Sequence, residues 1–290
     1  MDPQKALESA GGVITHRNPA RCTVRLRCPA GLLTPEQLVG LGRIARNAGI
    51  DAVHLTTRQT LELPGVDPNS LGPLLDALEG NKTPLGAERN EVVNVVACPG
   101  TASCRLAAIE TVDLARELDR RFFGVELPVK MRIGISACPN MCAGESLCEI
   151  GITGIRRPLR DTARCTGCGT CANTCREGAI MMVNGSLSLD EARCVSCGMC
   201  IDRCPFAVLS DEGAAYRVTV GGRRGRHPAV GHELVTVQTP GQVVVVVGAV
   251  LDRCYRRAYM DRHFADQLDL MDLEQLRAEL NLRFKSGDEP

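Results

Sequence analysis

Hydrophobic and polar positions along this chain follow two different periods, which together predict a mixed α+β fold. Residues 23–27 alternate apolar and basic side chains, as expected of a strand with one polar face. Thr34 and Pro35 carry the signals of a helix N-terminus, and Gly49 marks the end of that helix. Two further strands and a second helix are predicted over residues 51–57, 59–63 and 71–78. This order of elements is typical of a ferredoxin-like half-domain.

The pattern resumes after a polar linker at residues 79–88. Near the end of the chain, Thr239 and Gln242 have the spacing of a capping box, which predicts a helix to about residue 262. Five consecutive valines favour a strand there instead, because β-branched side chains are stiff. The remaining predicted elements are strands over 92–97 and 130–136, and amphipathic helices over 105–122 and 271–284.

Two cysteine runs of identical spacing carry the clearest chemical signal. Triplets spaced three apart and followed by a fourth cysteine are typical of cubic iron–sulfur clusters, in which the fourth cysteine ligates the cluster of the other run. Structural zinc sites are the alternative, but they use separated pairs of cysteines. The sequence therefore predicts two [4Fe–4S] clusters in a bacterial-type ferredoxin module. One is held by Cys165, Cys168, Cys171 and Cys204, and the other by Cys194, Cys197, Cys200 and Cys175.

A second cysteine set consists of two pairs, Cys98 with Cys104 and Cys138 with Cys142. Spacing alone indicates four soft ligands from two loops, which suits either a third cluster or a zinc site. The other four cysteines have no partner at ligand spacing, and we expect them to be small buried residues: Cys22, Cys28, Cys148 and Cys254.

Composition narrows the class of protein. The chain has 34 basic and 34 acidic residues, so neither nucleic acid nor an anionic membrane is an expected partner. Residues 1–8 are polar and suggest no export signal, so the sixteen cysteines are expected to be metal ligands or core residues of a soluble, cytoplasmic protein. The longest apolar run, residues 243–251, is too short to span a bilayer.

Four motifs in order give a resemblance to a known family: Arg25 and Arg27 on one strand, Thr56-Thr57-Arg58-Gln59, the paired cysteines, and Lys130 with Arg132 just before Cys138. From about residue 21 to about residue 226, the chain resembles the siroheme-dependent sulfite and nitrite reductases. It is most similar to the anaerobic sulfite reductases, in which one subunit carries a ferredoxin module inserted into its siroheme domain. The resemblance implies a half-domain over 1–85, a siroheme and [4Fe–4S] domain over 86–159 and 212–290, and an inserted two-cluster ferredoxin domain over 160–211.

The same resemblance implies the cofactors and their ligands. Siroheme and three [4Fe–4S] clusters are expected, one of them coupled to siroheme through Cys142 and completed by Cys98, Cys104 and Cys138. His54, Thr56 and Arg58 match siroheme-carboxylate positions, and we expect them along one face of a strand. Arg27, Lys130 and Arg132 match the residues that contact the substrate anion. The implied reaction is the six-electron reduction of sulfite to sulfide.

One departure from the family concerns Val93, which stands where the family usually has an anion-binding arginine. Losing one charged donor costs about 1.5–3 kcal/mol of anion binding. Nitrite reduction, or a catalytically silent electron-transfer role, therefore remains an alternative. The sequence has no Gly-x-Gly-x-x-Gly nucleotide fingerprint and only one copy of the host unit. We expect electrons from a separate ferredoxin or flavoprotein, and a homo- or hetero-oligomer.

Overall fold

The computed structural model describes residues 11–285, so the polar N-terminal segment at residues 1–8 lies outside the described residues. Contacts divide the chain into two units. Unit one holds the chain up to Ala97, Ala115–Ile133 and Gly248–Leu273. Unit two holds Cys98–Leu114, Gly134–Val247 and the chain from Glu274.

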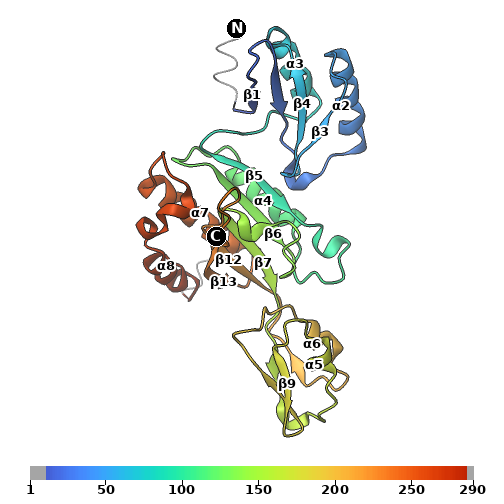
Figure 1. Ribbon diagram of the computed structural model, residues 1–290, viewed down its shortest axis with the longest axis vertical. Coiled ribbons are helices and arrows are strands. Elements are labelled where there is room, and N and C mark those ends of the chain that lie inside the picture. Colours follow the sequence, from blue (N-terminus) through green and yellow to red (C-terminus); the bar gives the residue numbers. More distant parts are fainter. Residues whose placement is uncertain (1–10, 286–290) are drawn as a thin grey trace. The chain divides into compact units, whose positions relative to one another are not determined.

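Unit one begins with a four-stranded antiparallel sheet in the order β1-β2-β4-β3, accompanied by two helices (Figure 1). Its strands are β1 (Val13–Thr15), β2 (Cys22–Arg25), β3 (His54–Leu55) and β4 (Leu61–Val66), its helices are α2 (Pro35–Asn47) and α3 (Leu71–Gly80), and two 3-10 turns lie at Pro29–Gly31 and Pro68–Ser70. Leu41, Leu63 and Leu78 join these elements in one apolar core. The ferredoxin-like order of elements is confirmed.

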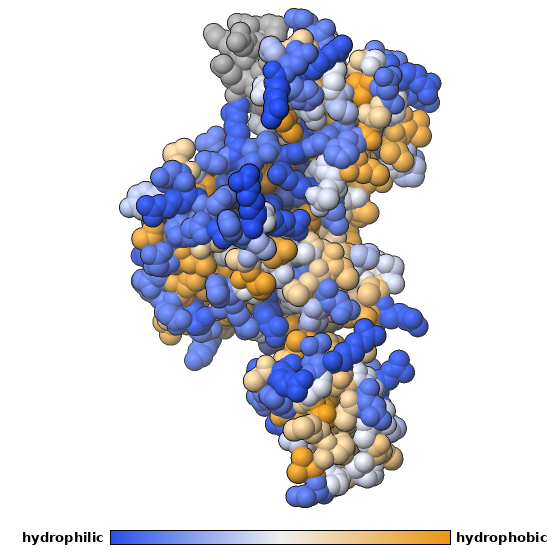
Figure 2. All heavy atoms as spheres, in the orientation of Figure 1, coloured by the Kyte–Doolittle hydropathy of each residue, from blue (hydrophilic) through white to orange (hydrophobic). Residues whose placement is uncertain are grey.

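Helix α2 begins where the sequence predicts. The Thr34 hydroxyl accepts a hydrogen bond from the Gln37 N–H at 3.2 Å, and the Gln37 side chain accepts one from the Thr34 N–H at 2.9 Å. Gly49 follows the helix with a φ of 68°, which costs glycine no steric strain. Figure 2 shows hydrophobic surface over α2, where Leu38 and Val39 are exposed. The helix is therefore apolar on part of its outer surface as well as on its core face.

The turn after β3 corrects one expectation. The strand ends at Leu55, so His54, Thr56 and Arg58 do not share a strand face. The Thr56 hydroxyl accepts hydrogen bonds from the N–H groups of Arg58 at 3.2 Å and Thr60 at 3.3 Å, and Gln59 has a φ of 56°. These local bonds close a tight turn, because a threonine hydroxyl competes with the strand ladder for backbone donors.

Unit one continues with β5 (Val92–Ala97) and shares β6 (Met131–Ser136) with unit two. Helix α4 (Val112–Phe122) is seven residues shorter at its start than the predicted helix over 105–122. The Glu110 carboxylate accepts hydrogen bonds from the N–H groups of Val112 and Asp113, at 2.7 and 2.9 Å. These bonds satisfy the first free donors of the helix and fix its start there.

Unit two is built on β7 (Ile150–Ile155), β12 (Ala215–Val220) and β13 (His232–Val237), all antiparallel. Ala215 pairs with Ile155 and Tyr216 with Val237, and the register between β12 and β13 shifts by one residue at Leu234. With β5 and the shared strand β6, the full order is β13-β12-β7-β6-β5. The 3-10 turn at Gly100–Ala102 lies between Cys98 and Cys104, and the 3-10 turn at Glu145–Leu147 follows Cys142.

Within unit two, the two cysteine runs belong to a small substructure whose ends meet. Strand β8 (Leu159–Arg160) pairs antiparallel with β11 (Leu209–Ser210), so the chain returns to the point where it left β7. Between them lie a turn at Thr162–Arg164, α5 (Thr170–Thr174), the hairpin β9 (Ile180–Val183) with β10 (Ser186–Leu189), and α6 (Met199–Arg203). The predicted bounds of the insertion, 160–211, fall at these two strands, and its status as a separate domain stays a prediction.

The tail is helical: α7 (Pro240–Arg257), a 3-10 segment at Phe264–Met271, and α8 (Leu273–Lys285). Thr239 and Gln242 form the predicted capping box, with both reciprocal bonds at 3.2 Å. The alternative of a valine strand is wrong, because burial of Val243, Val246 and Val247 outweighs their weak helix propensity. Helix α7 ends five residues before the predicted position. Within residues 11–285, no helix has the length and apolar character needed to cross a membrane.

Candidate functional site

The four paired cysteines lie together in unit two. Cys98 follows β5, and its sulfur accepts a hydrogen bond from the Ala137 N–H at 3.1 Å, next to Cys138. Burial raises the pKa of the Cys138 thiol, and the thiolates of Cys104, Cys142 and Cys98 raise it further. Like charges act on each other in this way only at short range. The four thiols therefore lie within electrostatic reach of one another, and their ligation of one cluster stays a prediction.

A buried carboxyl group supports the loop that carries Cys138 and Cys142. Glu145 is fully buried, accepts hydrogen bonds from the hydroxyls of Ser136 and Thr153, the latter at 3.0 Å, and has a pKa raised by burial. The Ser136 oxygen in turn accepts a bond from the Ala143 N–H at 3.2 Å. Sequence reasoning missed this network, because a single glutamate after a cysteine pair carries no periodic signal.

The Gly221-Gly222-Arg223-Arg224 segment also contacts the loop that carries Cys138 and Cys142. Arg224 donates hydrogen bonds to the carbonyl oxygens of Ala143 and Gly144, at 3.3 and 3.2 Å. A side chain on Gly222 would meet the Cys148 carbonyl oxygen at 2.2 Å, so only glycine fits there. This arrangement gives the basic segment a structural role.

The two cysteine runs sort into the predicted ligand sets. Burial raises the pKa of Cys171, and the thiolates of Cys204 and Cys165 raise it further. In the other set, burial raises the pKa of Cys200 to about 11, with further contributions from Cys197, Cys194 and Cys175. Cys204 acts on Cys171, and Cys175 acts on Cys200. In each set, one thiol that raises the pKa therefore comes from the other cysteine run. The neighbours of Cys171 and Cys200 agree with the crossed pattern, and the two ligand sets stay predictions.

Corresponding residues shape the two runs alike. Gly169 and Gly198 have φ of 76° and 74° and begin the short helices α5 and α6, a conformation that disfavours residues with a side chain. The sulfurs of Cys175 and Cys204 each accept a backbone N–H bond at 3.3 Å, from Ala179 and Val208. Such bonds stabilise thiolates and tune the potential of a cluster.

Within residues 11–285, no three His, Cys, Asp or Glu side chains are grouped as ligands of a single metal ion. A [4Fe–4S] cluster binds one thiolate at each iron, so its four ligands stand further apart than those of one zinc ion. The grouping expected of a single zinc ion is therefore not found among the described residues.

In unit one, basic side chains from separate segments converge on one carboxylate. Glu88 forms ion pairs with Arg58 and Lys130, both at 2.8 Å, and with Arg25. Arg132 lies near enough to act on Lys130. Burial, followed by the guanidinium groups of Arg58, Arg25 and Arg132, lowers the pKa of the Lys130 ammonium, which favours release of a proton. Arg58, Lys130 and Arg132, which the sequence assigned to two different roles, thus lie in one cluster around a glutamate that the prediction did not include, and those roles stay predictions.

Arg25 extends this cluster toward His54. Its Nε donates to Glu62 at 2.9 Å, and Glu62 also pairs with His54 Nδ1 at 2.9 Å. Arg25 is 9% exposed, so a solvated strand face is the wrong account of this arginine. The His54 side chain itself is 63% exposed.

Arg27 is engaged elsewhere in unit one. Its Nε donates to Asp119 at 2.9 Å, and its guanidinium lies 4.2 Å from the centre of the Phe123 ring. Burial raises the pKa of Asp119, although its bond to Arg27 acts in the opposite direction. Loss of Arg27 would leave the buried carboxylate of Asp119 unpaired, at a cost of about 3–5 kcal/mol. Arg27 therefore has a structural role, and its contact with substrate stays a prediction.

The turn that carries Arg58 is fixed to β5. The Gln59 side chain donates to the Ala97 carbonyl at 2.7 Å and accepts from the Ala97 N–H at 2.9 Å, while Asn94 donates to the Arg58 carbonyl at 2.8 Å. Val93 is 3% exposed on the same strand, and the cavity beside it measures only about 10 Å³. Position 93 is therefore filled by a small apolar side chain in the core, and it contributes no positive charge.

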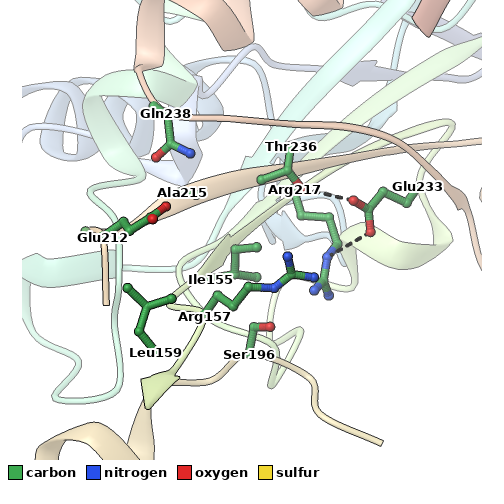
Figure 3. A pocket seen from close by; sticks show the side chains of 11 residues that line it. Ile155, Arg157, Leu159, Ser196, Glu212, Ala215, Arg217, Glu233, Thr236 and Gln238 are labelled. Atoms are coloured by element: carbon green, nitrogen blue, oxygen red, sulfur yellow. Dashed lines mark hydrogen bonds and ion pairs between the residues drawn. The ribbon is translucent and has the colours of Figure 1, made fainter. Parts of the chain in front are cut away.

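A cavity of about 240 Å³ lies in unit two, lined by residues of β7, β12 and β13 and by Ser196 (Figure 3). Within it, Glu233 pairs with Arg217 at 3.2 Å and accepts a bond from the Thr236 hydroxyl at 3.0 Å. None of the predicted site residues lines this cavity. Cavity size alone therefore does not locate the predicted chemistry.

Two family models match the chain. The ferredoxin-like half domain of nitrite/sulfite reductases matches residues 14–81, and the nitrite and sulphite reductase 4Fe-4S domain matches residues 88–287. The chain belongs to the nitrite and sulfite reductase family, an iron–sulfur oxidoreductase family. The predicted family and the predicted fold class are confirmed.

Relatives and solved structures agree with this assignment. An uncharacterized protein of Methanocaldococcus jannaschii is 31% identical over 88% of this chain and 89% of its own length. An anaerobic sulfite reductase subunit of Salmonella typhimurium is 32% identical over 77% of this chain and 72% of its own. The crystal structure of dissimilatory sulfite reductase I has a TM-score of 0.74 at 18% identity, covering 93% of this chain and 73% of that one. This last similarity concerns the fold alone.

Proposed function

We propose that the chain is a siroheme and iron–sulfur subunit that reduces sulfite to sulfide, with electrons relayed through two clusters at residues 160–211. The observation that carries the proposal is the convergence of Arg25, Arg58 and Lys130 on one carboxylate. We propose that these cations also face the carboxylates of siroheme and an oxyanion substrate, both of which need cationic donors.

The residues present fit the proposed cofactors. In unit one, Arg58, with His54 and Thr56 beside it in sequence, is assigned to siroheme carboxylates. In unit two, Cys98, Cys104, Cys138 and Cys142 are assigned to a [4Fe–4S] cluster, with Cys142 also the ligand shared with siroheme. When bound, siroheme supplies an iron that takes up the anion and passes electrons to it one at a time.

The chain's own residues supply charge and protons. Reduction of one sulfite consumes six electrons and six protons and releases sulfide and three water molecules. Lys130 and Arg132 stabilise the negative charge that builds on the oxygen atoms. The lowered pKa of Lys130 makes its ammonium the better proton donor of the two, since a guanidinium keeps its proton. Electrons are proposed to come from a separate ferredoxin or flavoprotein, within a homo- or hetero-oligomer.

Nitrite is the second candidate substrate, and Val93 is the observation that favours it. With valine in place of the family's arginine, the site has one positive charge fewer. This change weakens the attraction of doubly charged sulfite more than that of singly charged nitrite. An electron-transfer protein with no turnover of either anion is the third candidate.

Steady-state turnover of both anions, with reduced methyl viologen as donor, tests the proposed substrate. We expect a higher kcat/KM for sulfite, and a loss of roughly tenfold to a hundredfold in that value for Lys130→Ala, the scale of one charge-assisted hydrogen bond. Lys285→Ala, an exposed change at the end of α8, is the matched control and should leave kcat/KM unchanged. Faster turnover of nitrite would favour the second candidate. No turnover of either anion would favour the third.

A further inference from the structure

Glu88 is the common partner of three cations that come from separate parts of unit one. Arg25 lies on β2, Arg58 in the turn before β4, and Lys130 immediately before β6. Glu62, the neighbouring carboxylate, pairs only with Arg25 and His54 among the residues that the structure describes. The cluster is therefore organised around one negative charge of its own.

This negative charge lies next to the cation assigned to the substrate. Lys130 Nζ is 2.8 Å from Glu88 Oε1, so an anion bound by Lys130 shares that ammonium with the carboxylate. The side chains of Glu88, Arg58 and Lys130 are 27%, 25% and 36% exposed, which limits screening by water. The field of Glu88 therefore acts on whatever anion binds there.

The net positive charge of the cluster around Glu88 is smaller than a count of its basic residues suggests. Arg25, Arg58, Lys130 and Arg132 contribute four positive charges, and Glu88, Glu62 and Glu91 contribute three negative ones. Val93 adds none at the position where the family usually has an arginine. The repulsion between a carboxylate and a doubly charged anion is twice that for a singly charged anion at the same distance.

We propose that Glu88 is a specificity-determining residue, a built-in counter-anion that lowers the affinity of this cluster for dianions and favours singly charged anions such as hydrogensulfite or nitrite. This inference rests on the proposed function, because it assumes that Lys130 contacts the substrate anion. It adds that the singly protonated form of sulfite is the one selected.

The test is equilibrium binding by calorimetry to the cofactor-loaded protein, at one pH at which sulfite is a dianion and nitrite a monoanion. Glu88→Gln removes the charge and keeps the shape of the side chain. We expect it to tighten nitrite binding about threefold and sulfite binding about tenfold, because the two effects differ by the ratio of the charges. Glu88→Asp keeps the charge, so the ratio of the two affinities should remain that of the wild type.

Glu79→Gln, an exposed change on α3, is the matched control and should alter neither affinity. Equal fold-changes in sulfite and nitrite affinity for Glu88→Gln would overturn the inference. So would a change in the ratio of the two affinities for Glu88→Asp as large as the change for Glu88→Gln. If wild type and variants bind neither anion, the proposed function fails together with the inference. If both anions bind but Glu88→Gln leaves the ratio of their affinities unchanged, the role of Glu88 is overturned while the proposed function stands.

Discussion

Replacing Cys142 by alanine is expected to reduce sulfite turnover to background and to remove about four irons per chain, the content of one [4Fe–4S] cluster. Cys142 is exposed and lies in the set formed with Cys98, Cys104 and Cys138, so the change removes a ligand without leaving a hole in a packed core. The loss follows because the proposed cluster and siroheme share this sulfur. Iron and labile-sulfide analysis and turnover with reduced methyl viologen measure the result.

Cys148→Ala is the matched control for that variant. Cys148 is 1% exposed, lies on the same loop and has its sulfur 3.6 Å from the Gly144 carbonyl oxygen, but it belongs to none of the predicted ligand sets. It should keep its full iron content, with only the modest loss of stability that follows a small cavity. Retention of all irons in Cys142→Ala, or equal losses in the two variants, would contradict the assignment of Cys142.

Alanine at Cys168 or at Cys204 is expected to remove about four irons and to abolish turnover with a protein electron donor. Siroheme binding should survive either change, because the two cysteines belong to the substructure at residues 160–211. The crossed ligand pattern makes a sharper prediction for pairs of changes. Cys168→Ala with Cys204→Ala should lose no more iron than either alone, because both remove the same cluster.

Cys168→Ala with Cys175→Ala is the comparison, and it should lose about eight irons because it removes one ligand from each cluster. The measurement is iron content together with the tetrapyrrole absorption of each variant. A loss of about eight irons from the pair Cys168 and Cys204 would show that each run holds its own cluster. Loss of siroheme as well would mean that the substructure is needed for the fold rather than for electron relay.

The elements that could be predicted from the sequence are those specified by local chemistry. Thr34 and Gln37 form a capping box within four residues, and Thr239 and Gln242 do the same in a segment whose valines favour a strand. The three neighbouring cysteines of each run also follow from spacing, because a short tight loop brings its own sulfurs together, whereas the crossed fourth ligand was predicted from the known ligand pattern of paired runs.

The predictions that were wrong involve bonds that hydrophobic periodicity does not report. The Thr56 hydroxyl turns a predicted strand into a tight turn, and the Glu110 carboxylate delays the start of α4. For Arg25 the sequence does not decide between solvation and burial, since one basic residue on an alternating strand gives no information about its partner. Glu88 could not have been found, because its partners lie 30 to 63 residues away in sequence and only the fold unites them.

The central claim is that one chain holds siroheme and three cubic clusters, and the most direct measurement is the cofactor content of the protein purified without oxygen. The account predicts tetrapyrrole absorption together with about thirteen irons per chain, roughly twelve in three clusters and one in siroheme. A protein with about eight irons and no tetrapyrrole absorption would contradict it, because only the ferredoxin clusters would then be present.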